Sequence, residues 1–424
     1  GGLSHQHTHT VVMEVSGFQH QVGGHFGLLQ CEGHVAKPLD ARELAFYKQL
    51  SPRFRKFAPM YCGTVRVRAS AHKNGRLRLW SEKRSTPCHP SVVRAVVSTR
   101  SAEKEKASTR SRLSNSQYGE ECDEDEKREV SVMFRVNEDG RVEVDYREPT
   151  GHHWAANCQI KVVQKLLHVG QQGANFILLE NLVHGMERPC VLDLKMGTRQ
   201  HGDDASIEKQ HAQRRKCAES TSAALGVRMV GMELYEEATA SYSFIDKMQG
   251  RQMDERHFTA CLRRFLRAAG RTRAASMRSR LAELKATLEE AHGYRFFSSS
   301  LLVAFDASLT SSPIQVRMID FAHSTFAEFA GFVDVAYQGP DEGYIQGIDS
   351  LLDRIPLGEE AFDAEMKLVD EVPLLLPTLP TSSKSPSKTA TSSSVFVPSE
   401  VIDVPSASPS LSPDLTPAGS PDTI

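Results

Sequence analysis

Two residues in one short segment have the types and spacing expected of a group-transfer site. Asp193 and Lys195 lie two apart in the apolar run Pro189–Lys195, and residues two apart on a strand project from the same face. A carboxylate and an ammonium in one pocket can orient an acceptor and hold a neighbouring phosphate while charge develops. A structural salt bridge would have the same sequence pattern, and a motif this short does not separate the two.

Two further residues match the other needs of phosphoryl transfer, which are charge neutralisation along a triphosphate and a carboxylate for a metal ion. Lys37 ends a predicted strand and precedes a helix that Asp40 caps, with Glu43 as the capping-box partner. Asp320 ends the second strand of a predicted hairpin. The sequence therefore favours Lys37 for the phosphates, Asp320 for the metal and the Asp-x-Lys pair for the acceptor.

Hydrophobic periodicity and turn signals predict the elements that position these residues. The predicted strands form a glycine-tipped hairpin over 18–37, single strands at 59–68, 175–180, 189–195 and 227–235, and hairpins over 130–146 and 297–319. The predicted helices cover 40–50, 206–224 (capped by Ser206 and ended by Gly226) and two amphipathic stretches whose core stripes begin at Phe258 and Met277. The mixture predicts an α+β fold.

Composition limits the classes of partner. The 51 Lys and Arg residues nearly balance 53 Asp and Glu, for a formal net charge of -2, so no global charge favours nucleic acid or an anionic membrane. An anion-binding site must therefore be local. No run approaches the length of a membrane span. The eight cysteines form no CxxC pair, which favours reduced thiols in the cytoplasm or nucleus.

Three segments have the composition of disordered chain, which buries too little apolar surface to offset its ordering entropy. Residues 1–17 carry His5, His7 and His9, and a metal site there is the alternative to a tail. Residues 69–127 predict a flexible insertion, whose removal should leave activity intact. Residues 374–424 predict a Ser/Pro/Thr-rich tail. The tails and the insertion are where we expect protein partners to bind.

A family resemblance extends the Asp-x-Lys motif. Pro189–Gly197 matches the Pro-x-x-x-Asp-x-Lys-x-Gly signature of the inositol polyphosphate kinases. Further blocks resemble the inositol hexakisphosphate kinase branch: QVGGH at 21–25, FILLEN at 176–181, TRQHGDDAS at 198–206, YRFFSSSLL at 294–302, MIDFAHS at 318–324 and GPDEGYIQG at 339–347. They cover most of 18–352, which makes the resemblance specific.

The resemblance implies a two-lobed fold related to protein kinases and similar to ATP-grasp enzymes, with ATP between the lobes. The N-lobe would span 18–182 and the C-lobe 183–373. The implied activity is transfer of the ATP γ-phosphoryl group to inositol hexakisphosphate, and to the pentakisphosphate, with Mg²⁺ as the metal. The branch implies extension of the phosphate at carbon five.

The resemblance also assigns roles to individual residues. For the nucleotide, Lys37 would contact phosphates, Glu180 and the backbone of Leu182 would form the adenine hinge, and Gly23 and Gly24 would form a roof. Asp193 would orient or deprotonate the acceptor. The remaining assignments are substrate contacts by Lys195, Thr198, Arg199, Lys209 and His323, and metal contacts by Asp320 and Ser300.

For other basic residues the sequence does not separate anion binding from simple solvent exposure. Arg214, Arg215 and Lys216 follow on the helix after the signature and could reach an anion, although a basic helix face is more often only solvated. For the arginine-rich stretch Arg263–Arg280 we favour solvent exposure.

Two other functions stay open at this point. One is a multikinase or trisphosphate kinase that acts on less charged inositol phosphates, and the other is a scaffold that binds inositol phosphates without catalysis. The insertion, Gln346 and Ile348 depart from the branch pattern, and Ala268–Ala275 is unusual in composition. A catalytic loop of His-Arg-Asp type is absent from the sequence, which disfavours a protein acceptor.

Overall fold

The computed structural model describes residues 12–24, 26–82, 132–145, 153–332 and 335–367. These all belong to one unit, Gly1–Pro377. The predicted disordered tail 1–17 is described only from Val12, and the prediction is wrong there because Val12–Gly17 is a barrel strand. The predicted tail 374–424 and most of the predicted insertion lie outside the described residues.

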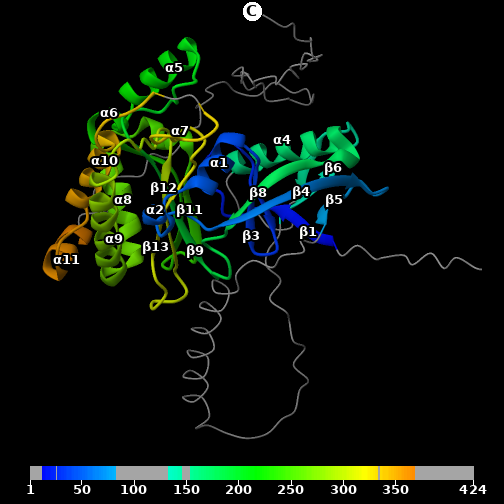
Figure 1. The fold of residues 1–424 in the computed structure, drawn as a ribbon. Helices are drawn as coiled ribbons and strands as arrows, with labels where there is room; N and C mark the ends of the chain where they lie inside the picture. The colour runs from blue at the N-terminus through cyan, green and yellow to red at the C-terminus, as the bar shows by residue number, and fades with distance from the viewer. Residues whose placement is uncertain (1–11, 25, 83–131, 146–152, 333–334, 368–424) are drawn as a thin grey trace, which may run out of the picture. The chain divides into compact units, whose positions relative to one another are not determined.

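The N-terminal half is built on a closed barrel in the strand order β1-β2-β3-β8-β4-β5 (Figure 1). Side chains alternate between the barrel interior and its outside, as period-two strands require; Val65, Val67 and Ala69 of β4 are buried in this way. The strands are β1 (Val12–Gly17), β2 (Leu29–Cys31), β3 (His34–Pro38), β4 (Tyr61–Ala71), β5 (Leu77–Glu82) and β8 (Ala174–Glu180).

Short elements complete this lobe. The ribbon of β6 (Met133–Val136) and β7 (Val142–Asp145) and the helix α4 (His153–Val169) pack on the barrel, and the 3-10 turn η1 (Gly170–Gln172) leads into β8. α1 (Ala41–Gln49) and α2 (Pro52–Arg55) follow β3. The Asp40 side chain accepts from the Glu43 backbone N–H, so the predicted helix start is confirmed.

The C-terminal half is a five-stranded antiparallel sheet in the order β11-β10-β9-β12-β13. Its strands are β9 (Pro189–Met196), β10 (Val227–Glu236), β11 (Ser241–Ile245), β12 (Ser300–Asp306) and β13 (Gln315–Ile319). The central strand β9 is buried at every residue, as an apolar run flanked on both sides predicts. The predicted boundary between residues 182 and 183 falls between the last barrel strand and β9.

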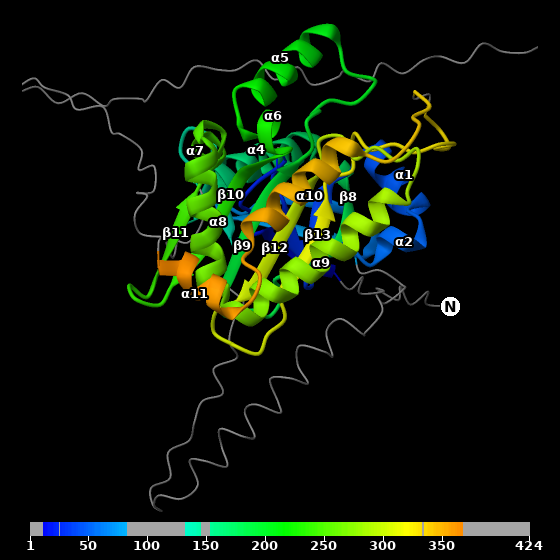
Figure 2. The same ribbon diagram turned by 90° about the vertical axis from the view of Figure 1, so that its left-hand side faces the viewer.

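Helices cover one face of this sheet (Figure 2). α8 (Glu255–Ala269) and α9 (Arg271–Glu289) pack against its strands through the stripes that begin at Phe258 and Met277, both fully buried. α10 (Glu342–Arg354) packs there through Tyr344, Ile348 and Leu351. The remaining helices are α5 (Ile207–Ala218), α6 (Thr221–Leu225), α7 (Lys247–Gln252) and α11 (Glu359–Lys367). Among the described residues no helix is long and apolar enough to cross a membrane.

Three sequence predictions about these elements were wrong. The predicted insertion begins too early, because Ala69–Ala71 and β5 belong to the barrel; a deletion from Ala69 would remove a barrel strand and is not expected to be tolerated. The predicted helix 206–224 is two helices, since the Ser220 hydroxyl caps α6. Glu43 is not a capping-box partner, because its carboxylate binds elsewhere, as described below.

The arginine-rich stretch 263–280 is also less exposed than predicted. Arg273 is only 6% exposed and donates to the carbonyl oxygens of Asp306 and Ser312, each at 2.9 Å. Arg263 pairs with Glu365 of α11 at 2.7 Å. These arginines therefore fasten helices and loops of the C-terminal half rather than lying free in solvent.

Gly226 ends α6 in the left-handed conformation, with φ of 65°. A β-carbon at this position would lie 2.7 Å from the Gly347 backbone nitrogen. Gly226→Ala should therefore lower the unfolding free energy by about 2–4 kcal/mol, from left-handed strain plus overpacking, as measured by urea denaturation. Gly140→Ala is the control, because φ is 77° there but nothing lies within 4 Å. Equal effects of the two changes would contradict the packing at Gly226.

Candidate active site

Strand register brings the Asp-x-Lys pair together with β10 and β12 on the sheet face opposite the helices. Lys195 lies opposite Arg228 of β10 and Ser300 of β12, and Asp193 lies opposite Gly231 and Leu302. Side chains two apart share a face. This site face therefore carries the pair in its centre, as the spacing predicted.

Both residues of the pair are buried, with Asp193 2% and Lys195 5% exposed. Burial raises the pKa of Asp193 to about 6, the Asp320 carboxylate adds to the rise, and Lys195 opposes it. Burial lowers the pKa of Lys195. The Lys195 ammonium donates to the Ser298 carbonyl oxygen at 2.5 Å. Asp193 and Lys195 therefore have partners inside the protein, Lys195 for the carboxylate and the Ser298 carbonyl oxygen for the ammonium, which a charged ligand could replace.

Lys37 bridges the two halves of the molecule. Its ammonium lies 2.8 Å from Glu43 Oε1 of α1 and 2.6 Å from Asp320 Oδ1, which follows β13. Burial lowers the pKa of Lys37, but the two carboxylates more than offset this and hold it above its ordinary value. Glu43 Oε1 also accepts from the Phe321 backbone N–H at 3.0 Å. Asp320 has φ of 64°, a conformation that costs energy for a non-glycine residue and is common at functional sites.

Gly23, one of the two glycines predicted to form a roof over the nucleotide, lies against the Asp193 carboxylate. A β-carbon on Gly23 would be 1.9 Å from Asp193 Oδ2, so the backbone at Gly23 is in direct contact with that carboxylate. Gln21 fixes the loop by donating to the Gly23 and Phe26 carbonyl oxygens, at 3.0 and 2.6 Å. Gly24 follows with φ of 88°.

Glu180 and Leu182 lie where the barrel joins the sheet. Glu180 ends β8, and its backbone N–H donates to the Met60 carbonyl oxygen at 2.9 Å. Its carboxylate accepts from the Met60 N–H at 3.1 Å. Asn181 caps the turn after it by accepting from the Val183 N–H. Glu180 and Leu182 therefore lie between the two halves, and their adenine-binding role stays a prediction.

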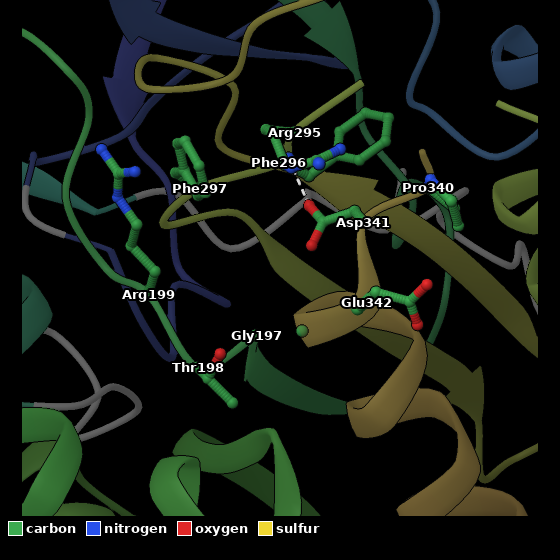
Figure 3. Close-up of a pocket in the computed structure, with 10 residues that line it drawn as sticks. Gly197, Thr198, Arg199, Arg295, Phe296, Phe297, Pro340, Asp341 and Glu342 are labelled. Carbon is green, nitrogen blue, oxygen red and sulfur yellow. Dashed lines mark hydrogen bonds between the residues drawn. The ribbon is translucent and has the colours of Figure 1, made fainter. Parts of the chain in front are cut away.

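Thr198 and Arg199 line a cavity of about 160 Å³ between β9, the Phe296–Phe297 segment and the start of α10 (Figure 3). The Asp341 carboxylate at its wall accepts from the Phe296 N–H at 2.7 Å. The guanidinium of Arg199 lies 4.0 Å from the Phe297 ring centroid. It also donates to Asp203 and to the Tyr337 hydroxyl, at 2.6 and 2.9 Å. Arg199 therefore joins two loops, and its predicted contact with substrate is not needed to explain it.

Lys209 and His323 approach the site face from two elements. Lys209 is exposed on α5, whose first turn is capped by Ser206. Burial lowers the pKa of His323 to about 4, and the positive charges of Lys209 and Lys195 contribute. His323 Nδ1 lies 3.9 Å from Asp204 Oδ1. The neutral ring thus lies among cations beside the Asp-x-Lys pair.

A cluster of cations lies around Lys247. Two of its members, Lys195 and Lys216, were candidates from the sequence, but Arg228, Lys247 and Arg251 were missed. Burial lowers the pKa of Lys247 to about 8, and the charges of Arg251, Lys216, Lys195 and Arg228 each lower it further. Lys247 and Arg251 belong to α7, and Gly250 of the same helix lets it approach β10 closely. A β-carbon on Gly250 would lie 2.3 Å from the Met229 carbonyl oxygen. We call these five residues the basic cluster.

The sequence alone contains only part of the signal for this cluster. Lys195 and Arg228 are directly opposed on neighbouring strands, and like charges in that position destabilise a sheet. Recognising the conflict requires the register, which a single sequence does not supply. Lys247 and Arg251 are four apart on a helix capped by Asp246, so they lie on one face.

Comparison with known proteins agrees with this geometry. The family model for inositol polyphosphate kinases matches residues 176–356. Mouse inositol hexakisphosphate kinase 3 is 34% identical over 371 residues, which covers 79% of this chain and 92% of that protein. Human inositol hexakisphosphate kinase 1 is 33% identical over 403 residues, with 79% and 91% covered. The chain belongs to the inositol polyphosphate kinase family.

Solved structures give a weaker likeness. The yeast inositol phosphate multikinase Ipk2, crystallised with ADP and Mn²⁺, is 27% identical with a TM-score of 0.36, over 43% of this chain and 83% of that one. Membership of the family therefore rests on the sequence relatives. The family resemblance predicted from the sequence blocks is confirmed, and the individual site roles stay predictions.

The Lys37 bridge is open to a stability test. Lys37→Met leaves Glu43, which is fully buried, without its cation, and breaking a buried pair in this way costs about 3–5 kcal/mol. Urea denaturation should show that loss. Lys56→Met is the control, because Lys56 and Glu283 form an exposed pair, 47% and 44% accessible, and exposed pairs contribute little. A Lys37→Met protein as stable as the Lys56→Met protein would contradict the bridge.

Proposed function

We propose that the protein transfers the γ-phosphoryl group of ATP to inositol hexakisphosphate, and to the pentakisphosphate, to form diphosphoinositol polyphosphates. The observation that carries the proposal is the basic cluster next to Asp193, two of whose members, Lys195 and Arg228, are buried. Lys195 and Arg228 lie in register on neighbouring strands, and the cost of holding two like charges there is offset when an anionic ligand binds. The relatives named above are inositol hexakisphosphate kinases, and the chain spans more than nine-tenths of their length.

The site fits a nucleotide with Mg²⁺. Asp193 Oδ1 and the Ser300 hydroxyl are buried next to each other, and each oxygen keeps lone pairs for a ligand. Mg²⁺ in nucleotide sites needs only one or two carboxylates besides phosphate oxygens. The part of the chain that the structure describes holds no group of three or more His, Cys, Asp or Glu side chains able to bind a metal, which suits a metal held largely by the nucleotide.

We assign the nucleotide side to Lys37, Asp320 and Ser300. When bound, Mg-ATP supplies the phosphoryl group and neutralises part of its charge. Lys37 would hold phosphate oxygens while Glu43 fixes its position, and Asp320 with Ser300 would bind the metal. Glu180 and the Leu182 backbone would receive the adenine. Only groups placed beforehand can stabilise the charge that develops during transfer.

The acceptor side is the Asp193 carboxylate and the basic cluster. Inositol hexakisphosphate has a phosphate at every ring carbon, so the attacking atom is a phosphate oxygen. A carboxylate whose pKa is about 6 matches the second pKa of a phosphate ester, also near 6, so one proton can be shared between them. Lys195 would then hold the acceptor phosphate, and Lys209, Thr198 and His323 would bind its neighbours. We assign Arg199 to positioning of the Thr198 loop.

The first test is the reaction itself. Purified protein with Mg-ATP and inositol hexakisphosphate should form a diphosphoinositol product, resolved on a polyphosphate gel. Asp193→Asn should lower kcat by about 10²–10⁴-fold, the usual range for a group that handles a proton in transfer. Asp139→Asn is the control, since Asp139 is an exposed carboxylate in the turn between β6 and β7. Consumption of only tris- or tetrakisphosphate would indicate a multikinase, and binding without turnover would indicate a scaffold.

The second test separates substrates by charge. Lys247→Gln and Arg251→Gln should each raise KM for inositol hexakisphosphate about 10-fold, because each removes a charge-assisted contact, and should change KM for ATP little. Lys285→Gln is the control, because Lys285 pairs with Asp349 of α10 at 2.6 Å. Added salt should raise the KM for inositol hexakisphosphate more in the wild type than in either variant. An unchanged acceptor KM in both variants would contradict the assignment.

Compartment and partners are further proposals. We propose that the protein acts in the cytoplasm and nucleus, which is supported by six described cysteines that form no disulfide. We also propose that partner proteins bind through the predicted tails, 1–17 and 374–424, and through the predicted insertion, and that nucleic acid is not a partner.

A further inference from the structure

The catalytic pair is inaccessible as the structure stands. Asp193 and Lys195 are 2% and 5% exposed, yet the acceptor proposed above is an inositol ring crowded with phosphates. No such molecule can reach a carboxylate this deeply buried. Some part of the chain must therefore move before the acceptor binds.

The segment in contact with the carboxylate is residues 20–24, which we call the covering loop. Gly23 leaves no room for a β-carbon beside Asp193 Oδ2, where the distance would be 1.9 Å. One residue earlier, the Val22 carbonyl oxygen lies over Gly231, where a β-carbon would be only 1.8 Å away. Because Gly231 is in register with Asp193, the loop lies across the middle of the site face.

The covering loop has its own internal support. Gln21 is 3% exposed, donates to the Gly23 carbonyl oxygen and accepts from the Leu28 N–H at 2.9 Å. On the barrel side, Gln159 of α4 donates to the Phe18 carbonyl oxygen at 2.6 Å. The loop therefore keeps its shape without help from the sheet, which lets it move as a unit.

Few contacts hold the covering loop down on the sheet. His20 Nδ1 lies 3.1 and 3.2 Å from the two carboxylate oxygens of Glu233 on β10. Val22 packs in a small apolar cluster with Val191 and Ala304. The loop backbone adds the close contacts of Gly23 with Asp193 and of Val22 with Gly231. Besides these contacts, one hydrogen-bonded side-chain pair and one apolar side chain hold the loop on the sheet, so its separation is a local opening.

We propose that the covering loop is a lid on the acceptor site, latched to the sheet by His20 and Glu233. The proposal rests on the proposed role of Asp193 at the acceptor. The lid opens to admit the polyphosphate and, while closed on an empty site, keeps water from the catalytic carboxylate. An enzyme whose competent state is only partly populated binds its ligand more weakly by that fraction, so the latch sets the apparent affinity for the acceptor.

Weakening the latch tests the lid. His20→Ala and Glu233→Gln should each lower KM for inositol hexakisphosphate about 3- to 10-fold, because the open state becomes more populated. In the absence of acceptor both should raise the rate at which water takes the γ-phosphoryl group, giving ADP and phosphate, by a similar factor. The double variant should behave like either single one, since both break the same pair.

Hydrogen exchange provides a readout that does not depend on turnover. Backbone amides of residues 21–24 should exchange about 3- to 10-fold faster in both latch variants than in the wild type. Glu236→Gln is the matched control, because Glu236 lies on the same strand and pairs with Arg264 of α8 at 2.7 Å. It should leave KM, ADP formation and loop exchange at wild-type values.

The outcomes separate the lid from the proposed function. Latch variants with wild-type KM and wild-type loop exchange, in a wild-type protein that forms product, would refute the lid and leave the function standing. A wild type that forms no product would refute the function, and loop exchange alone would then decide whether the latch holds the loop closed. A raised KM in both latch variants would also refute the lid, because it would mean that the pair helps to bind the acceptor.

Discussion

Two buried cations that face each other across neighbouring strands are the constraint on which this site depends. Lys195 and Arg228 are in register on β9 and β10 and are 5% and 7% exposed. Opposed like charges cost stability, and burial adds to the cost. Asp193, the Ser298 carbonyl oxygen and the Ser222 hydroxyl offset part of it. The positive charge that these groups leave uncompensated attracts polyanions, and it is present before a ligand binds.

The rest of the fold keeps this charge concentrated. Backbone approaches that only glycine permits bring α7 against β10 at Gly250 and the covering loop against the sheet at Gly231. Lys37 holds Glu43 and Asp320 together across the two halves, so the Asp320 carboxylate, which we propose for the metal, has a fixed position relative to the barrel. The arginines of α8 and α9 pair with carboxylates and donate to carbonyl oxygens of the C-terminal half. They lie on the helix side of the sheet, and the site lies on the opposite face.

Much of the fold could be predicted from the sequence, because its signals are local. The strand at Pro189–Lys195, the Asp40 and Ser206 caps and the core stripes of α8 and α9 follow from pattern alone, and the motif blocks identified the family. What failed depends on tertiary structure. The sequence pattern predicts Glu43 as a capping-box partner, although its carboxylate binds Lys37. The polar, charged stretch after Arg68 predicts an insertion, although its first part forms barrel strands. The cations of α7 can be assigned to the site only when the tertiary structure shows that they lie near Lys195.

The most direct test of this account compares the stability and the ligand response of one variant. Arg228→Met removes one of the opposed cations and keeps an apolar side chain of similar length. The account predicts that thermal denaturation without ligand shows a stability equal to or above that of the wild type, while most of the rise in Tm produced by inositol hexakisphosphate disappears. A variant that is strongly destabilised yet keeps the full rise in Tm would contradict it, because Arg228 would then serve the fold rather than the polyanion.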